Sequence, residues 1–484
     1  MTRHSQPAGS AKPRRAVIIG GGMAGMLAAA VLAGHADEVT VIERDALPTR
    51  PEPRKSLPQA RHVHVLWSGG ARAFEQIIPG ITGRWLAAGA RRIPLPTGLV
   101  SLTAQGWLRR WPEMQYMIAC TRDLLDWVVR EHVLALPSVT VLQRHEMQGF
   151  EGSAGRVTGV RLRTPDGSDM TLDADLVVDA GGRGSRATEW LRSLGVHGIK
   201  EAEVDSGLVY ASRLYRAPVG SEEFPIVNVQ SDPNEPVPGR TATIVPVEGG
   251  RWLVTLSGTR GGEPSRDPDQ FETFARSVRH PVVGELIART EPLSPEVTVT
   301  RSTVNRRHYF EKALTWPEGL IVIGDAVATY NPLYGQGMTV AAQGLVALDG
   351  ILRRHDLGVP GLARRIQRAI ARPATVAWEL ATSQDILYPG AQGQQPRPGT
   401  AVANRYVDRL VRTATGRAQV TRAFLGVITM SAPVTSWLHP DVVAAVVRGP
   451  GRGLLPGPPL THAERSVAAG RHGQAPEPQP SSTR

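Results

Sequence analysis

The sequence predicts an α/β protein with three parts: a parallel sheet covered by helices, a second domain of β-strands, and a helical region towards the C-terminal end. Two observations predict this arrangement. Strand-like apolar runs that lead into glycine-rich turns and helices begin near residues 14, 174 and 319. Short alternating runs separated by turns fill residues 205–260, and residues 360–450 have the composition of helices.

The composition is that of a globular protein and excludes some classes of function. Hydrophobic residues make up 41% of the 484 residues and charged residues 20%. The net charge is +11, but the basic residues are mostly arginines scattered along the chain, so we expect no nucleic-acid binding. The one cysteine, Cys120, cannot form an intramolecular disulfide, and we expect it to be a small buried side chain.

Residues 14–36, RRAVIIGGGMAGMLAAAVLAGHA, fit three alternatives: a secretory signal, a membrane anchor, or the first turn of a nucleotide-binding fold. Glycines in the middle of the stretch would weaken the apolar helix that either of the first two needs. The run AVIIG before them is typical of a buried strand, and MAGMLAAAVLAGH after them of a helix that stops near Gly34. We therefore expect a nucleotide-binding fold, no membrane span and a cytoplasmic location.

The glycines have the spacing of a dinucleotide fingerprint, Gly20-x-Gly22-x-x-Gly25. Gly20 permits a tight turn, Gly22 lets the backbone approach a pyrophosphate, and Gly25 lets the helix pack closely, with its N-terminal end facing the phosphates. A second strand, EVTVIERD, ends at Glu43, whose carboxylate can accept hydrogen bonds from a ribose diol. The cofactor-binding residues expected here are Gly20, Gly22, Met23, Ala24, Gly25, Glu43 and Arg44.

A later segment, GLIVIGDAVATYNPLYGQGMTVAAQGL from Gly319, indicates which dinucleotide is bound. An apolar strand ends at Asp325, where a carboxylate can hydrogen-bond a ribityl hydroxyl, and a proline-bearing loop leads to a helix near Gly337. The free N–H groups at the start of that helix would stabilise negative charge on a reduced flavin. The segment favours FAD, with Gly324, Asp325, Pro332, Gly335, Gly337 and Met338 as cofactor contacts.

Together with ADLVVDAGGRGSRATEWL (174–191), these segments resemble the FAD-dependent monooxygenases of the para-hydroxybenzoate hydroxylase fold. The resemblance implies a Rossmann-like FAD-binding domain, discontinuous over residues 14–200 and 300–355, and a β-sheet substrate domain over 201–299 that roofs the flavin. It also implies that Arg122, which precedes a helix in TRDLLDWVVRE, reaches the flavin side; a surface or helix-capping arginine is the alternative. We expect the loop around His62 and His64 to lie near FAD, with Arg61 as a cofactor contact. In one departure, Gly181 stands where the family's middle motif has an aspartate, and Asp179 is the nearest acid.

Further stretches are similar to one subgroup, the flavin epoxidases of polyether ionophore biosynthesis. They are PQARHVHVLWSGGAR (58–72), MIACTRDLLDWVVRE (117–131), DSGLVYASRLYRAP (205–218), GGRWLVTLSGTRGGEP (249–264), RSTVNRR (301–307) and ATSQDILYPG (381–390). The resemblance implies epoxidation of alkenes of a linear polyene polyketide by a C4a-hydroperoxyflavin, with NAD(P)H as electron donor directly or through a flavin reductase. The substrate would arrive free or bound to a carrier, and an epoxide hydrolase would act on the product.

In such an enzyme the flavin carries the chemistry, so we expect no catalytic protein side chain. Trp67, Tyr210 and Tyr215 are candidates for the substrate pocket, although each is as well suited to the core. His62 and His64 could lie on one side of a strand, but no third ligand is evident and we expect no metal. Residues 1–13 and 455–484 are rich in Pro, Gly, Ser and Gln, and we expect them to be disordered.

The residues leave three other functions open. Hydroxylation of an aromatic or polyketide ring usually needs a base or relay to deprotonate a phenol, and substrate trials would separate it from epoxidation. A flavin reductase or dehydrogenase acting on C–C bonds would turn over without oxygen. A non-catalytic flavoprotein would bind FAD without NAD(P)H-dependent oxygen consumption.

Overall fold

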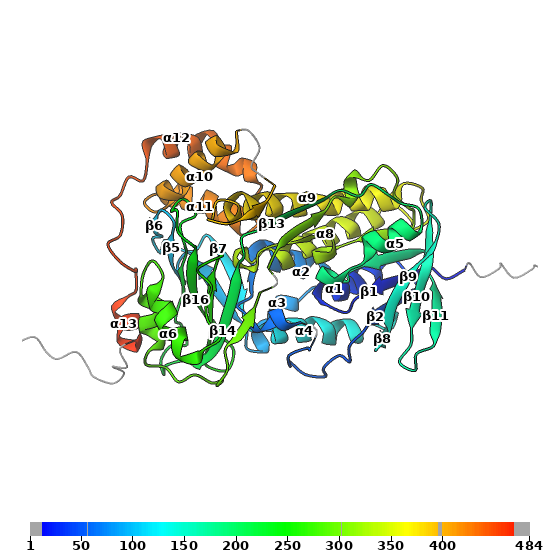
Figure 1. Cartoon of the computed structure of the whole chain (residues 1–484), viewed down its shortest axis with the longest axis horizontal. Helices are drawn as coiled ribbons and strands as arrows, with labels where there is room; N and C mark the ends of the chain where they lie inside the picture. The colour runs from blue at the N-terminus through cyan, green and yellow to red at the C-terminus, as the bar shows by residue number, and fades with distance from the viewer. Residues whose placement is uncertain (1–11, 56, 302, 395–398, 469–484) are drawn as a thin grey trace, which may run out of the picture.

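The structure, a computed structural model, describes residues 12–55, 57–301, 303–394 and 399–468 of the chain. Figure 1 shows two lobes side by side. One lobe is built on a parallel sheet and the other on a larger, mainly antiparallel sheet. The parallel sheet carries the predicted dinucleotide motifs, and the larger sheet carries the expected substrate-domain strands.

The parallel sheet has five strands in the order β20-β12-β1-β2-β8. Their bounds are β20 (Leu320–Val322), β12 (Leu176–Asp179), β1 (Arg15–Ile19), β2 (Glu38–Glu43) and β8 (Val139–Gln143). The runs RAVII and LVVD are rich in β-branched residues and almost fully buried, as is typical of strands covered by helices on both faces. The strand–turn–helix units predicted near residues 14, 174 and 319 therefore contribute neighbouring strands of one sheet.

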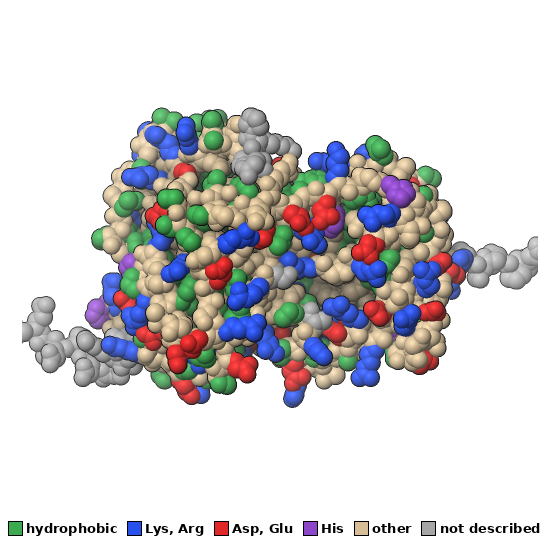
Figure 2. All heavy atoms as spheres, in the orientation of Figure 1, with side chains coloured by type: hydrophobic (Ala, Val, Ile, Leu, Met, Phe, Trp, Pro, Cys, Tyr) green, Lys and Arg blue, Asp and Glu red, His purple; other side chains and the backbone are tan. Residues whose placement is uncertain are grey.

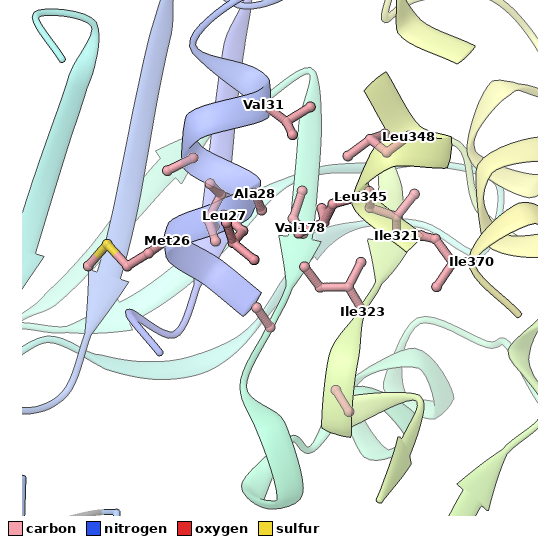
Figure 3. Packing of buried hydrophobic residues seen from close by; sticks show 14 of the residues in the cluster. Met26, Leu27, Ala28, Val31, Val178, Ile321, Ile323, Leu345, Leu348 and Ile370 are labelled. Atoms are coloured by element: carbon pink, nitrogen blue, oxygen red, sulfur yellow. The ribbon is translucent and has the colours of Figure 1, made fainter. Parts of the chain in front are cut away.

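Helices α1 (Met23–Leu32), α4 (Arg122–Leu134) and α9 (Leu362–Asp385) pack on strands of this sheet, and α8 (Gly337–Leu352) packs on α1 and α9. Helix α1 begins directly after the glycine turn, and α8 begins at Gly337 as the sequence predicts. The side chain of Thr121 caps α4 by accepting a hydrogen bond from the N–H of Leu124. Figure 3 shows apolar side chains of α1, β12, α8 and α9 meeting with Ile321 and Ile323 in one layer.

Smaller elements complete this lobe and its junction with the second. Two three-stranded sheets and one four-stranded sheet occur among the described residues. Their strands are β9 (Glu146–Gly152), β10 (Val157–Arg163) and β11 (Asp169–Asp173); β3 (Val65–Trp67), β7 (Gln115–Ala119) and β4 (Arg91–Leu95); and β21 (Ala328–Thr329), β19 (Asn305–His308), β13 (Glu201–Asp205) and β22 (Gln392–Gly393). The remaining helices here are α2 (Ser68–Ile77), α3 (Ile81–Ala87) and α5 (Ala187–Ser193).

The second lobe is a seven-stranded sheet in the order β18-β14-β17-β16-β15-β5-β6. Its strands are β18 (Thr298–Thr300), β14 (Val209–Arg216), β17 (Arg251–Gly258), β16 (Arg240–Val247), β15 (Ile226–Val229), β5 (Leu99–Thr103) and β6 (Gly106–Trp107). The alternating runs predicted as strands between residues 205 and 260 form β14 to β17, which confirms them. One face of the sheet packs on α6 (Pro268–Ser277) and α7 (Val282–Ile287).

The limits of this sheet differ from the expected domain range of 201–299. Strands β5 and β6 come from residues 99–107, inside the range expected for the FAD-binding domain. The reason is that β5 pairs in parallel with β15, with Leu99 opposite Ile226, and thereby extends the second sheet. A pairing between segments so distant in the sequence leaves no local pattern.

Helices α10 (Thr400–Ala414), α11 (Ala418–Ile428) and α12 (Pro440–Arg448) follow α9 and have an apolar core of their own. They form the helical region expected over residues 360–450, and Figure 1 shows them against one end of the second lobe. Among the described residues, no helix has both the length and the apolar character needed to cross a membrane.

The expectation of disorder from residue 455 onwards is wrong for residues 455–468. Helix α13 (His462–Ala468) lies beside α6 in Figure 1, and Leu460 and Val467 are buried in the core under the seven-stranded sheet. Apolar side chains spaced among the prolines and glycines supply the burial that the composition alone does not indicate. The expectations for residues 1–11 and 469–484 lie outside the described residues.

Candidate cofactor and substrate site

Three turns from distant parts of the sequence meet at the carboxyl ends of β1, β12 and β20. The first two turns touch, because a Cβ on Gly20 would lie 2.7 Å from the carbonyl oxygen of Ala180. The third reaches the first, because a Cβ on Gly324 would lie 3.0 Å from the Cβ of Ala24. In open α/β sheets the ligand crevice lies at this end of the strands. The fold therefore brings the predicted dinucleotide motifs into one place.

The three fingerprint glycines have different surroundings. Gly20 has a φ of +94°, a conformation that favours glycine. A Cβ on Gly25 would lie 1.8 Å from the carbonyl oxygen of Gly20, so only glycine allows α1 to approach the turn so closely. A Cβ on Gly22 would have no protein atom within 4 Å. Gly22 faces open space, and the protein itself does not require a glycine there.

Glu43 is held at the glycine turn by Arg54, a residue that the sequence analysis missed. One carboxylate oxygen, Oε2, accepts a hydrogen bond from the N–H of Gly21 (2.9 Å) and lies 2.6 Å from Nη2 of Arg54. Arg54 also donates to the carbonyl oxygen of Gly21 (2.9 Å), and both members of the ion pair are buried. The other oxygen, Oε1, accepts a hydrogen bond from the N–H of Asp45 (2.9 Å) and can accept one more. The neighbouring Arg44 is exposed.

Asp325 lies directly after β20 in a 3-10 turn (Gly324–Ala326). Its side chain is exposed to solvent, yet the surrounding protein desolvates the carboxyl group and raises its pKa, while the charges of Arg183 and Arg122 oppose the rise. Its Oδ1 lies 3.7 Å from the position of a Cβ on Gly337. The Asp325 side chain is therefore open to solvent while protein surrounds its carboxyl group. Figure 2 shows the surface hollowed over the region where Figure 1 places the start of α1.

The two arginines expected near the cofactor lie in different environments. Arg122 is the first residue of α4, with a mostly buried side chain whose Nε lies 2.6 Å from Oδ1 of Asp126. Its positive charge also opposes the rise in the pKa of Asp325. Arg61 ends a short 3-10 turn (Pro58–Arg61) and is exposed.

The middle motif closes its turn with Asp179 rather than with an acid at position 181. Asp179 is buried at the end of β12, where it accepts hydrogen bonds from the N–H of Gly181 (2.8 Å) and from the hydroxyl of Ser185 (2.6 Å). Burial raises the pKa of Asp179, although both hydrogen bonds oppose the rise. The carboxylate of Asp179 therefore stabilises the turn itself by accepting these two hydrogen bonds.

A buried carboxylate in α9, Asp385, holds the loop that leads into α8. Three side chains donate hydrogen bonds to it: the amides of Asn305 (2.7 Å) and Asn331 (3.0 Å) and the hydroxyl of Tyr334 (3.1 Å). Asn331 also accepts a hydrogen bond from the hydroxyl of Tyr210 (2.5 Å). Burial raises the pKa of Asp385, and its hydrogen bonds oppose the rise. The network joins α9, β19, β14 and the loop, and the sequence analysis singled out none of Asp385, Asn305 and Asn331.

The loop itself passes through a 3-10 turn (Pro332–Tyr334) to Gly335, whose φ is +63°. A Cβ on Gly335 would lie 2.8 Å from Cγ2 of Val65 and 3.1 Å from Nε1 of Trp67. Trp67 donates from Nε1 to the carbonyl oxygen of Tyr334 (3.0 Å). Helix α8 then starts with Gly337 and Met338, and among the described residues no acceptor contacts the N–H groups of residues 337–339.

The two tyrosines expected in the substrate pocket lie on opposite faces of the seven-stranded sheet. They are five residues apart in β14, and successive side chains of a strand alternate between faces. Tyr210 faces the loop through its hydrogen bond to Asn331. Tyr215 is buried on the other face, with its ring 6.1 Å from that of Phe271 in α6. The assignment of Tyr215 to the substrate pocket is therefore wrong, and Tyr215 belongs to the core beneath the sheet.

An apolar wall lies where β3 meets the second sheet and α11. Its members share one property: they pack against a buried apolar cluster but remain only partly buried themselves. They are Val63, Val65, Trp67, Met114, Leu214 and Phe424. Val65 and Trp67 are also the residues next to Gly335. The wall therefore borders the loop that leads into α8.

The two histidines of the 58–72 stretch are neutral at pH 7. His62 is hydrogen-bonded through both ring nitrogens, to the hydroxyls of Ser212 (2.7 Å) and Thr300 (2.7 Å). Burial lowers the pKa of His62 to about 4, and burial together with the charge of Arg122 lowers that of His64 to about 3. His62 therefore has no ring nitrogen left to act as a base. Within the described ranges, no cluster of three or more His, Cys, Asp or Glu could hold a metal ion.

The residues at the cleft fit a dinucleotide with a pyrophosphate. Gly22 leaves space for a ligand, and so do Gly182 and Gly184 in the second turn. In the described part of the chain, no acceptor contacts the N–H groups of residues 23–25 at the start of α1. Unpaired N–H groups at a helix N-terminus favour bound anions. The start of α8 offers the same donors beside Asp325.

Comparison with known proteins identifies the family. Residues 14–355 match the family model described as FAD binding domain. Protein Rv3254 of Mycobacterium tuberculosis is 32% identical over 389 residues, which cover 77% of this chain and 80% of that protein. Kynurenine 3-monooxygenase of Salinispora arenicola is 28% identical over 384 residues, covering 72% and 74%. The structure of p-nitrophenol 4-monooxygenase PnpA from Pseudomonas putida has the same fold, with a TM-score of 0.59 and 16% identity over 85% of this chain and 97% of that one. The chain therefore belongs to the FAD-binding-domain family and groups with its FAD-dependent monooxygenases.

Proposed function

We propose that this FAD-dependent monooxygenase epoxidises alkenes of a linear polyene polyketide, a precursor of a polyether. The sequence stretches that resemble the polyether epoxidases support the proposal. The observation that carries it is the apolar wall of Val65, Trp67 and Leu214 beside the loop into α8, next to a histidine whose nitrogens are both occupied. An apolar chain fits such a wall, and an alkene needs no protein base.

FAD supplies activated oxygen when it is bound and has received electrons from NAD(P)H, directly or through a flavin reductase. In the proposed binding mode, the backbone of Gly22, Met23 and Ala24 would donate to the pyrophosphate, and Oε1 of Glu43 would accept from a ribose hydroxyl. Asp325 would accept from a ribityl hydroxyl. The N–H groups of Gly337 and Met338 would donate to the flavin, and Arg122 would contribute a positive charge.

The protein side chains then have to hold the substrate and exclude water. Contacts along the wall fix the position of one alkene, which turns a random encounter into a reaction within a complex. The neutral His62 neither donates nor removes a proton in this proposal. A polyene that is presented by a carrier protein would use the same wall, and an epoxide hydrolase would use the product.

Hydroxylation of an aromatic ring is the second candidate function. The kynurenine 3-monooxygenases among the relatives favour it. A phenol substrate needs a base or a relay for its proton, and the occupied nitrogens of His62 argue against that residue in this role.

Substrate trials distinguish the two candidates. Purified holoprotein, NADPH and a flavin reductase would be incubated in air with a linear polyene ester, a phenol or kynurenine. We expect oxygen to be added to the polyene only, as measured by mass spectrometry, with matching NADPH consumption. Conversion of the phenol or kynurenine without conversion of the polyene, free or as a thioester, would establish ring hydroxylation instead. Omitting the reductase tests whether NADPH reduces the flavin directly.

A further inference from the structure

A row of polar side chains crosses the seven-stranded sheet on the face that bears Tyr210. Cross-strand pairing places them directly opposite one another on five adjacent strands, and opposed residues point to the same face. In order along the row they are Ser101, Asn228, Thr243, Thr255 and Ser212. Most residues in central strands of a covered sheet are apolar, so a row of five polar side chains is unusual and suggests a function.

The row faces the substrate side of the sheet rather than the side covered by α6 and α7. The N–H of Val63, a member of the apolar wall, donates to the hydroxyl of Thr255 (2.9 Å). His62 bonds to Ser212 in the same row. Leu214, two residues after Ser212 in β14, belongs to the wall itself. The polar row and the apolar wall are therefore parts of one surface.

Two neighbours in the row are less buried than the rest. Ser101, Thr255 and Ser212 are 3%, 6% and 2% exposed, whereas Asn228 and Thr243 are only half-buried. Both lie within central strands of a seven-stranded sheet. Side chains there are accessible only where the layer above leaves a gap, so the gap lies over Asn228 and Thr243.

These two residues also carry hydrogen-bond donors that have no acceptor among the described residues. The side chains of Ser101, Asn228 and Thr243 carry a hydroxyl, an amide and a hydroxyl, which together hold four donor hydrogens. Two are used, from Ser101 to Oδ1 of Asn228 (3.4 Å) and from Nδ2 of Asn228 to the hydroxyl of Thr243 (2.7 Å). In the described part of the chain, one N–H of Asn228 and the O–H of Thr243 meet no acceptor. Rotating the amide by half a turn leaves two donors over as well.

We propose that Asn228 and Thr243 form a subsite for an oxygen acceptor of the substrate, a carbonyl, ester, hydroxyl or carboxylate, while the apolar wall holds the carbon chain. The inference rests on the proposed function, whose substrate class it narrows to oxygen-bearing chains. A pure hydrocarbon would cover two donors without pairing them, which is costly in a buried site. A site with donors of this kind rejects analogues that lack the matching acceptor.

The test measures binding to the oxidised holoenzyme, so that it does not depend on turnover. Changes in the flavin absorbance spectrum would report the Kd of two probe pairs: a linear polyene hydrocarbon with the polyene ketone of equal length, and an alkylbenzene with the aryl ketone of equal size. The variant Asn228→Leu/Thr243→Val keeps the shapes and removes the donors. Thr241→Val is the matched control, since Thr241 is paired with Ser257 in the adjacent row and both are buried.

We expect the wild type and Thr241→Val to bind the ketone of at least one pair about tenfold more tightly than its hydrocarbon. In the double variant that preference falls to within about twofold, because the ketone loses affinity and the hydrocarbon does not. A preference that persists in the double variant, or no preference in the wild type for either pair, overturns the subsite. Binding of the aryl pair alone, with the preference removed by the double variant, supports the subsite but contradicts the polyene assignment.

Discussion

Replacing Gly22 with valine separates the requirements of the fold from those of the cofactor. A Cβ at this position meets no protein atom within 4 Å, and the backbone there is extended, with φ of −79° and ψ of −175°, which a valine adopts readily. Valine is a poorer N-cap than glycine, but it also lowers the entropy of the unfolded chain, and the two effects offset each other to within about 1 kcal/mol. The apo-protein should therefore fold with nearly unchanged stability.

FAD binding by Gly22→Val should be weakened at least 100-fold in Kd, or about 2.8 kcal/mol. The reason is that the new side chain occupies the space through which the proposed pyrophosphate contact is made. We would measure the FAD content of the purified protein, and the Kd for FAD by fluorescence titration of the apo-protein. A thermal melt of the apo-protein would measure its stability.

Two matched variants complete this experiment. Gly83→Val adds the same side chain in open, exposed space in α3 and should leave FAD binding unchanged. Gly25→Ala forces a Cβ to 1.8 Å from the carbonyl oxygen of Gly20 and should lower the melting temperature of the apo-protein itself. Gly22→Val protein that purifies with a full complement of FAD and the wild-type Kd would refute the placement of the cofactor.

Three further predictions follow from the site. Asp325→Ala should raise the Kd for FAD by about tenfold or more in the same titration, because it removes one hydrogen bond to a charged acceptor. An unchanged Kd would show that Asp325 does not contact the cofactor. Asp385→Asn places an amide N–H against three donors, so we expect weaker FAD binding and more hydrogen peroxide per NADPH oxidised. The control Glu379→Gln, on the exposed side of α9, should behave as wild type. An equal yield of hydrogen peroxide per NADPH in both variants would contradict the role of the network. The pKa of His62 is about 4 in the folded protein and 6.5 ordinarily, so between these pH values the unfolded chain binds more protons than the folded protein. The contribution of the neutral His62 to the free energy of unfolding is therefore complete above pH 6.5. It falls by about 3 kcal/mol as the pH drops to 4. His62→Gln should reduce this pH dependence in urea unfolding, unlike His439→Gln at an exposed site, and equal slopes for the two variants would argue against a buried neutral His62.

Sequence patterns predicted the cofactor end of the molecule because its signals are local. A strand, a glycine turn and a helix follow one another within 20 to 30 residues, and each is fixed by its own residues. Gly20 and Gly25 show why: Gly20 has a positive φ, and a Cβ on Gly25 would collide with the carbonyl oxygen of Gly20 in the same turn. Parallel strand order then brought the separate motifs together.

The remaining features depend on contacts between distant segments. Arg54 follows no periodic pattern, and only the folded loop brings it to Glu43 and Gly21. Asp385 stands in a quoted stretch, but its partners come from β19 and the loop before α8. The position of Tyr215 does have a local signal, because an odd separation from Tyr210 within one strand places the two rings on opposite faces.

In the proposed reaction, this chain epoxidises an alkene with oxygen taken from O₂. The most direct measurement is mass spectrometry of the product formed from a linear polyene ketone by the holoenzyme, NADPH and a flavin reductase under ¹⁸O₂. We expect a product that carries one or more ¹⁸O atoms and that acid converts to a diol or cyclic ether. Unlabelled polyene recovered together with a labelled, hydroxylated aromatic product from a parallel phenol reaction would contradict it.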